Sequence, residues 1–472
     1  MSRTPKEHYT TERVEVPLPR ETRRELALLV AVFVSARLMS IWWFRPLHND
    51  VETFFFPFAW LQSLGVYPFI HYWFEYFPVQ AYLLVVLRWL AVAVFGRGDV
   101  AHECLALVRT VQMASVAWEL GILHLVYSLA RMLRGPKPAV RACWLYVALF
   151  STAFVSLSYV ETFPVFLMLA GLLLAAYGRP MGAAGVAAAG FMAKLFPVGL
   201  LPVLVKCEAR WRWRLAVLGA FALAVAAIAA PFLISRPRWL ALSFEATARR
   251  PPWETVWALL DRRYDFGYIG PGAADRTPAF FDQQAGFGVA PGVKELLDGL
   301  PPEVMDARAE GPRRTIYYYV AAHFATDLRF LDGPPRPRDG YWLLYGGVGL
   351  ALVLFYLITL ARLPSALPPR RRLYLAAFTM CLLFFYAKGW SPQFVLYLIP
   401  LVLIAFPVAE GGLWALLLTA VTFLQMPVWA AYVNPRPGML VAGQLLLHLT
   451  AIARTGFLLA IVARLYPRLF ND

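Results

Sequence analysis

The stretch HNDVETFFFPFAWLQSLGVYPFIHYWFEYFP, residues 48–78, begins just beyond the first long apolar run of the chain. It carries three carboxylates, Asp50, Glu52 and Glu75, at the edge of that apolar run. Ionisable side chains at a membrane are costly, and those that persist usually serve chemistry or the handling of ions. The stretch therefore predicts a membrane protein with functional groups at one rim of the membrane.

The composition of the whole chain agrees with this class. Of 472 residues, 60% are hydrophobic and 15% are charged, and the mean hydropathy is +0.57, whereas soluble domains are usually about 45–50% apolar. We therefore predict an all-α fold, a polytopic bundle of transmembrane helices. The net charge of +15 is typical of Lys and Arg in cytoplasmic loops, beside anionic lipid headgroups, so we expect no nucleic-acid partner. The four cysteines show no CxxC spacing, which predicts neither a disulfide nor a zinc site.

Counting runs of about 17–25 apolar residues predicts about 12 crossings with both chain ends in the cytoplasm. The basic segment RMLRGPKPAVR (131–141) is cytoplasmic by the positive-inside rule. Residues 45–103 then form one external loop, in which Val79–Phe95 is a juxtamembrane helix. The alternative count makes Val79–Phe95 a crossing and places those cations outside. Lys194 and two prolines within 181–207 predict a broken helix near the external face.

These assignments divide the chain into a tail, an N-terminal membrane module, a long external loop, a C-terminal membrane module and a second tail. Both tails are predicted to be cytoplasmic. In the long loop, WETVWALLDRRY (253–264) has apolar residues at helical spacing, which predicts an amphipathic helix on the membrane surface. The five segments are 1–25, 26–234, 235–340, 341–465 and 466–472.

Three further motifs fall on the external side of this topology. They are SYVETFP with Glu161, the broken helix with Lys194, and KGWSPQF at 388–394. Carboxylates beside cations on one face suit a reaction in which a hydroxyl loses its proton and an anionic group departs.

The same motifs resemble those of the GT-C superfamily, integral membrane glycosyltransferases that use polyprenyl-phosphate sugars. NDVETFFFPFAWLQSLGVYPF followed by FEYFPVQAYL looks like their first external loop, AGVAAAGFMAKLFPVGLLP like their glycine-rich turn with a lysine before a proline, and GWSPQFVLYLIPL like their late Ser-Pro-Gln segment. The resemblance covers most of residues 26–408. The chain departs from the common pattern in EYFP, where two consecutive prolines are usual, and in Glu161, where aspartate is frequent.

The resemblance implies transfer of a hexose, expected to be mannose, from a polyprenyl or dolichyl phosphate to a glycan or glycolipid acceptor outside the cytoplasm, with inversion. Asp50 matches the catalytic carboxylate of the family, which implies a general base, and Glu52 and Glu75 are candidate helpers. We expect no cofactor, because Lys or Arg can neutralise the departing phosphate. The candidate substrate-binding residues are Glu161, Lys194, Lys388, Ser391, Gln393, Arg249, Arg250 and His48.

Other interpretations stay open at this point. Asp50 can instead cap the helix that begins near Val51, and Lys388 can complement a helix dipole. A divalent metal at His48, His71 and Glu75 is not favoured, because nothing in the sequence fixes their separation. At the level of the whole protein, the alternatives are a transporter or flippase of lipid-linked sugars and a noncatalytic scaffold of the same fold. The expected location is the plasma membrane with an external active site, or the endoplasmic reticulum membrane in a eukaryote.

Overall fold

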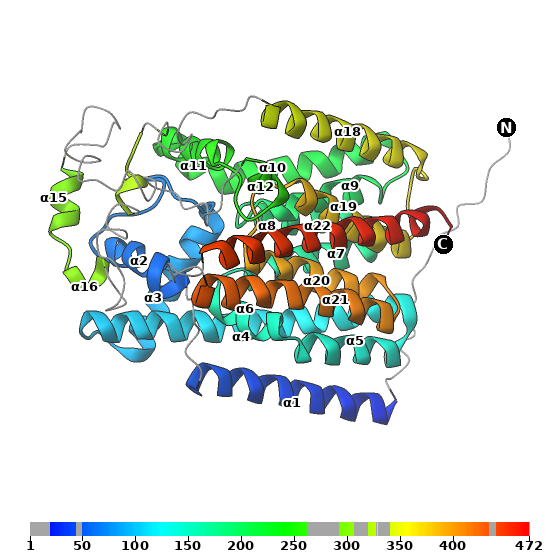
Figure 1. Ribbon diagram of the computed structural model, residues 1–472, viewed down its shortest axis with the longest axis horizontal. Helices are drawn as coiled ribbons and strands as arrows, with labels where there is room; N and C mark the ends of the chain where they lie inside the picture. The colour runs from blue at the N-terminus through cyan, green and yellow to red at the C-terminus, as the bar shows by residue number, and fades with distance from the viewer. Residues whose placement is uncertain are drawn as a thin grey trace.

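The computed structural model is built from α-helices that run side by side in one bundle (Figure 1). No β-sheet forms in the parts of the chain that the structure describes, where only two isolated β-bridges occur. The predicted all-α bundle is therefore confirmed. The structure describes residues 19–43, 50–261, 292–305, 320–326, 328, 340–433 and 440–471.

Seven helices in the described ranges are long and apolar enough to cross a membrane, so the chain is an integral membrane protein. A bent pair, α5 (Pro136–Ala148) and α6 (Phe150–Ser158), adds an eighth if its two helices count as one span, at an angle of 57°. The seven are α1 (Arg20–Trp43), α3 (Pro78–Phe95), α4 (Val100–Arg134), α10 (Trp211–Ser235), α18 (Gly340–Arg362), α21 (Val408–Phe423) with part of η5 (Leu424–Val433), and α22 (Leu440–Asn471).

The predicted number of crossings, about 12, stays a prediction. α3, which we expected beside the membrane, has the length and composition of a span, and Figure 1 shows it next to α2 (Phe56–Ser63) at one end of the bundle. The remaining helices of the bundle are α7 (Thr162–Ala176), α8 (Pro180–Phe191), η2 (Phe196–Leu200), α9 (Leu201–Val205), α19 (Pro369–Tyr386), η4 (Pro392–Phe394) and α20 (Val395–Ala405).

Prolines and glycines set many of the helix boundaries. A proline begins each of four helices, α3, α5, α8 and α19. Proline suits this position because its φ is already helical, and because the N–H that it lacks would have no hydrogen-bond partner in the first turn of a helix. α3 and α4 end at Gly96 and Gly135, where φ is 79° and 84° and glycine alone adopts the conformation without strain. The local sequence thus explains where these helices start and stop.

α4 is longer than a membrane span. Its 35 residues extend about 52 Å at 1.5 Å per residue, against about 30 Å for the hydrocarbon core of a bilayer. α3 packs along the first half of α4, where Arg88 Nη2 lies 2.8 Å from Glu103 Oε2 in a buried ion pair. This packing builds a structured layer at one end of the bundle.

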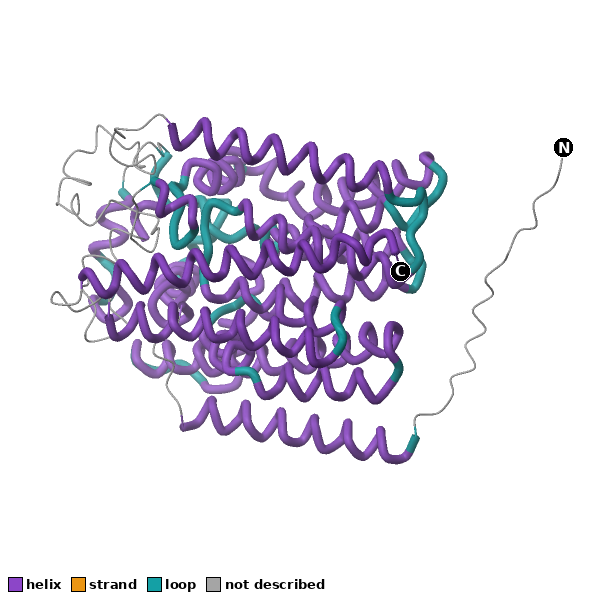
Figure 2. Tube along the Cα trace, turned by 45° about the vertical axis from the view of Figure 1, so that its right-hand side comes forward, coloured by secondary structure: helices purple, strands orange, loops and turns teal. Residues whose placement is uncertain are grey.

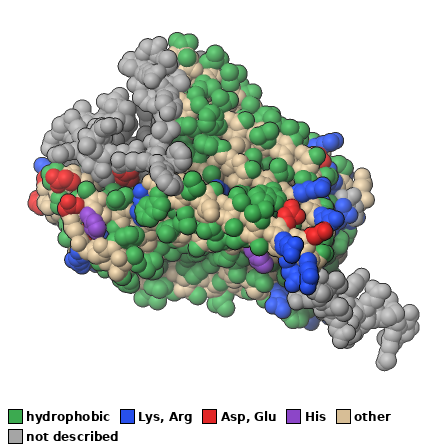
Figure 3. Space-filling view, turned by 90° about the horizontal axis from the view of Figure 1, so that it is seen from below, with side chains coloured by type: hydrophobic (Ala, Val, Ile, Leu, Met, Phe, Trp, Pro, Cys, Tyr) green, Lys and Arg blue, Asp and Glu red, His purple; other side chains and the backbone are tan. Residues whose placement is uncertain are grey.

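The two ends of the bundle differ in composition. At the basic end, α1 begins and α22 ends (Figure 2). Hydrogen bonds tie the turn between α18 and α19, and the start of α19, to neighbouring segments. Arg214 donates to the Ser365 carbonyl in the turn, and Arg372 Nη1 in α19 donates to the Ala175 carbonyl. On the face drawn in Figure 3, Lys and Arg side chains gather mainly at this end, beyond a broad apolar surface. The basic end carries Arg131, Arg134, Lys137, Arg179, Lys206, Arg210, Arg212, Arg214, Arg362, Arg370, Arg371, Arg372, Arg464 and Arg468.

The opposite end, called the loop end here, holds the short helices. Its core is an apolar cluster to which Val51, Phe55, Tyr76, Val160 and Met192 contribute. The cluster therefore joins the first loop to the α6–α7 and α8–η2 breaks. The short helices are η1 (Val51–Phe55), α2, α11 (Pro237–Arg249), α12 (Val256–Leu260), α15 (Val293–Asp298) and α16 (Pro302–Met305).

Candidate functional site

Lys194 lies in a break between two helices at the loop end. α8 ends at Phe191 and η2 begins at Phe196, so the helix predicted to break around Lys194 does so. Gly190 permits the tight return of the chain, because a Cβ there would approach Pro197 to 3.0 Å. The break places a lysine at the end of two helices that are otherwise apolar.

Glu161 lies in a second break, between α6 and α7, and pairs with this lysine. Lys194 Nζ is 2.8 Å from Glu161 Oε1, and the hydroxyl of Tyr397 donates to the other carboxylate oxygen at 2.9 Å. Although Glu161 is the N-cap residue of α7, its side chain makes no capping hydrogen bond. Glu161 therefore orients the lysine instead of capping a helix.

Two aromatic rings flank the same ammonium group. Lys194 Nζ lies 4.1 Å from the ring centroid of Tyr76 and 5.6 Å from that of Phe394, both within the range of cation–π attraction. The Lys194 side chain is 19% exposed, whereas that of Glu161 is 1% exposed. The lysine is thus held from three sides and remains accessible.

Glu75, next to Tyr76, pairs with Arg250. The Arg250 guanidinium carbon lies 4.0 Å from the ring centroid of Trp253, so the arginine is held between a carboxylate and an aromatic face. Arg249 instead pairs with Glu245 one turn earlier on α11, at 3.0 Å. Of the two arginines predicted as phosphate contacts, the structure brings Arg250 next to the first loop.

The segment that carries Trp253, here called the strap (residues 251–257), is inserted beside the KGWSPQF motif. Trp253 N donates to the Lys388 carbonyl at 3.2 Å, and Trp390 N donates to the Trp253 carbonyl at 3.1 Å. Trp257 Nε1 donates to Phe385 O at 3.1 Å. The prediction of an amphipathic helix on the membrane surface is wrong for this segment, because α12 has five residues and the Trp257 ring is buried against the bundle.

Glu254, at the centre of the strap, is tied to the last helix. It has a φ of 52°, a conformation that costs a non-glycine residue about 1 kcal/mol or more. Gln425 donates to its carboxylate, and Arg454 donates both to Gln425 Oε1 at 2.7 Å and to the Glu254 carbonyl. These buried contacts hold the strap in place.

The ammonium group of Lys388 donates hydrogen bonds to backbone carbonyls. Its Nζ donates to Ala248 O at 2.6 Å and to Arg250 O at 2.9 Å, so it neutralises the C-terminal end of α11. Ser391 Oγ accepts from Trp253 Nε1 at 3.4 Å. Gln393 is buried, and its Oε1 has no hydrogen-bond donor among the described residues, which leaves it an acceptor for a hydroxyl group.

Asp50 begins the helical turn that leads into η1. It is half-buried, and its side chain does not cap the helix, so the capping alternative is not what the structure adopts. Glu52 is buried. η1 packs against the ring that covers the lysine, since the Phe55 and Tyr76 ring centroids are 5.0 Å apart. His48 lies outside the described residues.

The motifs alone did not single out Tyr76, Tyr397 and Trp253 as site residues. Tyr76 lies within the FEYFP motif, and Tyr397 follows Gln393 by four residues, which places both on one face of a helix. A search for aromatic residues one turn from the motif residues would have found Tyr397.

Within the described ranges, no group of three or more His, Cys, Asp and Glu side chains is arranged to hold a metal ion. His71 Nδ1 accepts a hydrogen bond from Tyr67 N at 2.9 Å. All four cysteines are buried.

No family model matches the chain, and no curated protein matches it. The chain is similar in structure to the apo form of the oligosaccharyltransferase of Archaeoglobus fulgidus, with 13% identity and a TM-score of 0.41 over 94% of this chain and 56% of that chain. It thus spans little more than half the length of that protein, and no residue role is carried across. The described residues make the chain a helical integral membrane protein.

Proposed function

We propose that this protein is a membrane glycosyltransferase of the GT-C type. It transfers a hexose, expected to be mannose, from a polyprenyl or dolichyl phosphate to a glycan or glycolipid acceptor. The observation that supports this best is the convergence at Lys194. Motifs from four distant parts of the sequence meet there, with Tyr76 from FEYFP, Glu161 from SYVETFP and Phe394 from SPQF.

Lys194 is suited to the phosphate of the donor. Its ammonium group has three N–H donors, and Glu161 accepts one of them. The aromatic faces of Tyr76 and Phe394 exclude water from two sides while leaving the group partly exposed. A cation fixed in this way stabilises the dianion that forms when polyprenyl phosphate departs.

Asp50 is the proposed general base. Its carboxylate takes the proton of the acceptor hydroxyl as that oxygen attacks the anomeric carbon of the sugar. The bond between the anomeric carbon and the phosphate oxygen breaks, its electron pair stays on the phosphate, and the configuration inverts. The contact of η1 with Tyr76 supports this assignment, since it brings the segment of Asp50 beside the lysine site.

Other residues of the loop end are assigned supporting roles. Arg250, held by Glu75 and Trp253, is a second cation for the phosphate, and the buried oxygen of Gln393 accepts from a sugar hydroxyl. The site is opposite the basic end. By the positive-inside rule, it therefore faces away from the cytoplasm.

The decisive experiment is sugar transfer from radiolabelled polyprenyl-phosphate mannose by the purified protein, with a panel of glycolipid and glycan acceptors. Asp50→Asn is compared with Asp99→Asn, which removes the same charge from the N-cap of α4 at the same end of the bundle. We expect transfer by the wild type and by Asp99→Asn, and loss of transfer in folded Asp50→Asn.

Each other outcome has a definite meaning. Equal transfer by all three variants rejects Asp50 as the base. If the wild type binds the donor and never transfers its sugar to any acceptor, the protein is a transporter or a scaffold, and the proposal is rejected as a whole.

A further inference from the structure

Three arginines lie at helix ends at the basic end, at the opposite end of the bundle from the site just described. Arg134 ends α4, Arg371 lies in the first turn of α19, and Arg468 lies in the last turn of α22. We call these three residues the arginine cluster. The turn between α20 and α21 lies beside two of them, because Arg134 Nη2 donates to the Leu403 carbonyl at 2.5 Å and Arg468 lies 4.5 Å from the ring centroid of Phe406.

Contacts between helices keep the cluster in place. Arg371 Nη2 donates to the Phe470 carbonyl at 3.0 Å, which ties α19 to the end of α22. Arg134 is within electrostatic range of both Arg468 and Arg370. Arg134 and Arg371 are thus held by backbone carbonyls, which do not neutralise their charges, whereas Arg468 pairs with Glu410.

Four of the guanidinium N–H groups in the cluster are buried without a partner. Nε and Nη1 of Arg134, Nε of Arg371 and Nη1 of Arg468 have no solvent exposure and no hydrogen-bond acceptor among the described residues. A charged donor that is buried and unpaired is unfavourable. The fold therefore keeps a set of unsatisfied positive donors.

The usual bias of basic residues toward the cytoplasmic side does not account for this burial. Arg464, one turn before Arg468 on α22, shows the ordinary case, with a side chain 66% exposed, whereas that of Arg468 is 23% exposed. Among the described residues, Glu410 is the carboxylate that pairs with Arg468, and it is shared with Arg464. Arg134 and Arg371 have no carboxylate partner in the same ranges. Among the residues that the structure describes, positive charge is therefore in excess at this position.

We propose that the arginine cluster binds a phosphate group. The planar guanidinium presents pairs of N–H donors that match the oxygens of a phosphate, and each such hydrogen bond is charge-assisted. The phosphate belongs either to the headgroup of an anionic phospholipid or to a free phosphate compound. Both sources offer the same recognition chemistry.

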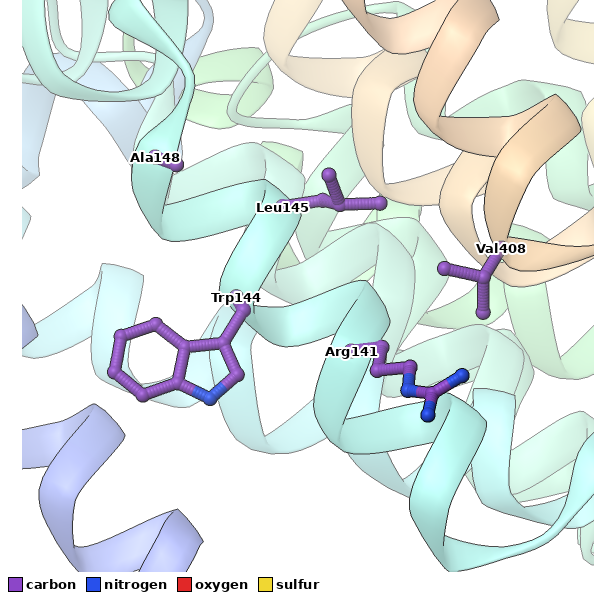
Figure 4. Close-up of a pocket in the computed structure, with 5 residues that line it drawn as sticks. All are labelled: Arg141, Trp144, Leu145, Ala148 and Val408. Atoms are coloured by element: carbon purple, nitrogen blue, oxygen red, sulfur yellow. The ribbon is translucent and has the colours of Figure 1, made fainter.

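An apolar groove next to the same turn fits the acyl chain of a lipid. The groove has a volume of about 410 Å³ and lies between α5 and the start of α21 (Figure 4). Val408, on its α21 side, lies in sequence between Phe406 and Glu410, the two residues that contact Arg468. The residues that line it are Arg141, Trp144, Leu145, Ala148 and Val408.

The test uses the full-length protein in an uncharged detergent and two binding measurements. Native mass spectrometry counts the molecules of phosphatidylglycerol or phosphatidylcholine that stay bound, and thermal unfolding is followed in sodium phosphate and in sodium chloride at equal ionic strength. The variants are Arg371→Gln and Arg468→Gln. Arg464→Gln is the matched control, because it removes the same charge and the same Glu410 partner from an exposed position.

A lipid headgroup is supported as the ligand if the protein retains phosphatidylglycerol selectively and if this binding is about tenfold weaker in the two cluster variants than in Arg464→Gln. A free phosphate compound is supported as the ligand if phosphate raises the unfolding temperature more than chloride does, if the two cluster variants weaken this effect, and if the protein shows no selectivity among lipids. Should Arg468→Gln not fold, Arg371→Gln decides. No response of the wild type to either ligand, or equal binding by all three variants, overturns the proposal. None of these measurements depends on sugar transfer.

Discussion

Lys194 Nζ lies 2.8 Å from Glu161 Oε1, and the two residues come from separate breaks between helices. The pair fixes the α6–α7 break to the α8–η2 break. Because Tyr397 holds the second oxygen of Glu161, the carboxylate cannot rotate away without losing two charge-assisted contacts. The position of the lysine is thus determined by residues on three other segments.

Replacing either member of this pair is expected to destabilise the protein. Removing one partner of a buried ion pair costs about 3–5 kcal/mol, with Glu161→Gln toward the lower value because the lysine that it leaves unpaired is partly exposed. The double variant Lys194→Met with Glu161→Gln should cost less than the sum of the two single changes, since neither charge is then left alone. Unfolding in detergent measures all three. Additive costs would contradict the coupling.

The same lysine is expected to matter for transfer beyond its effect on stability. If it stabilises the departing phosphate, Lys194→Met lowers transfer per folded molecule by about 10²-fold. Arg88→Met is the control, because it breaks the other buried ion pair of the loop end, with Glu103, away from Lys194. It should lower the unfolding temperature without this loss of rate. Equal rates in the two variants would remove Lys194 from the mechanism.

Arg37 forms another buried pair, inside the bundle. Its Nε and Nη2 donate to Glu119 at 3.0 and 2.7 Å, joining α1 to α4. Arg37→Met is expected to destabilise the protein by about 3–5 kcal/mol, because it leaves Glu119 charged and buried. Arg109→Met, which removes a side chain that donates to Gln112 on the same helix, should cost about 1 kcal/mol or less. Chemical denaturation in detergent distinguishes the two, and similar costs would refute this role.

Gly389 is expected to tolerate no side chain. A Cβ there would approach the Trp253 ring to 2.1 Å, so Gly389→Ala should displace the strap and raise hydrogen exchange over residues 251–257. Gly346→Ala on α18, where a Cβ meets nothing within 4 Å, is the control and should leave exchange in the strap unchanged. Wild-type protection of the strap in Gly389→Ala would show that Trp253 does not depend on this contact.

Chelators are expected to leave transfer unchanged. The groups suggested as ligands have other partners, because Glu75 pairs with Arg250 and His71 Nδ1 accepts from Tyr67 N. The measurement is transfer with and without a chelator in the same preparation. Activity that a chelator abolishes and one added divalent metal restores would assign a metal to the site.

Much of the helical organisation could be predicted from the sequence, because hydrophobic length and proline position act locally. The break at Lys194 is an example, since a lysine followed by Pro197 inside an apolar stretch cannot continue a buried helix. The convergence of the first loop with Glu161 and Lys194 also followed from the order of the spans.

The pairing of individual side chains could not be predicted in the same way. Lys388 and Lys194 look alike as lone cations near apolar runs, yet one neutralises the end of α11 and the other faces Glu161. The strap was misread because the spacing of Trp253 and Trp257 suits both a lipid surface and a protein surface. Only the tertiary contacts of Lys388 and Phe385 distinguish the two.

The strap anchors the first part of the long segment between α10 and α18 to the bundle. Everything up to residue 257 is tied to the bundle, so the geometry of Arg250 is set before the chain continues. The described residues after Asp261 also reach the first loop, because Trp73 Nε1 donates to the Ala322 carbonyl at 3.2 Å and Trp73 N donates to the His323 carbonyl at 3.1 Å. A chimera that exchanges this later part must therefore be matched to the first loop, which makes Trp73 and His323 a natural pair to exchange together in engineering.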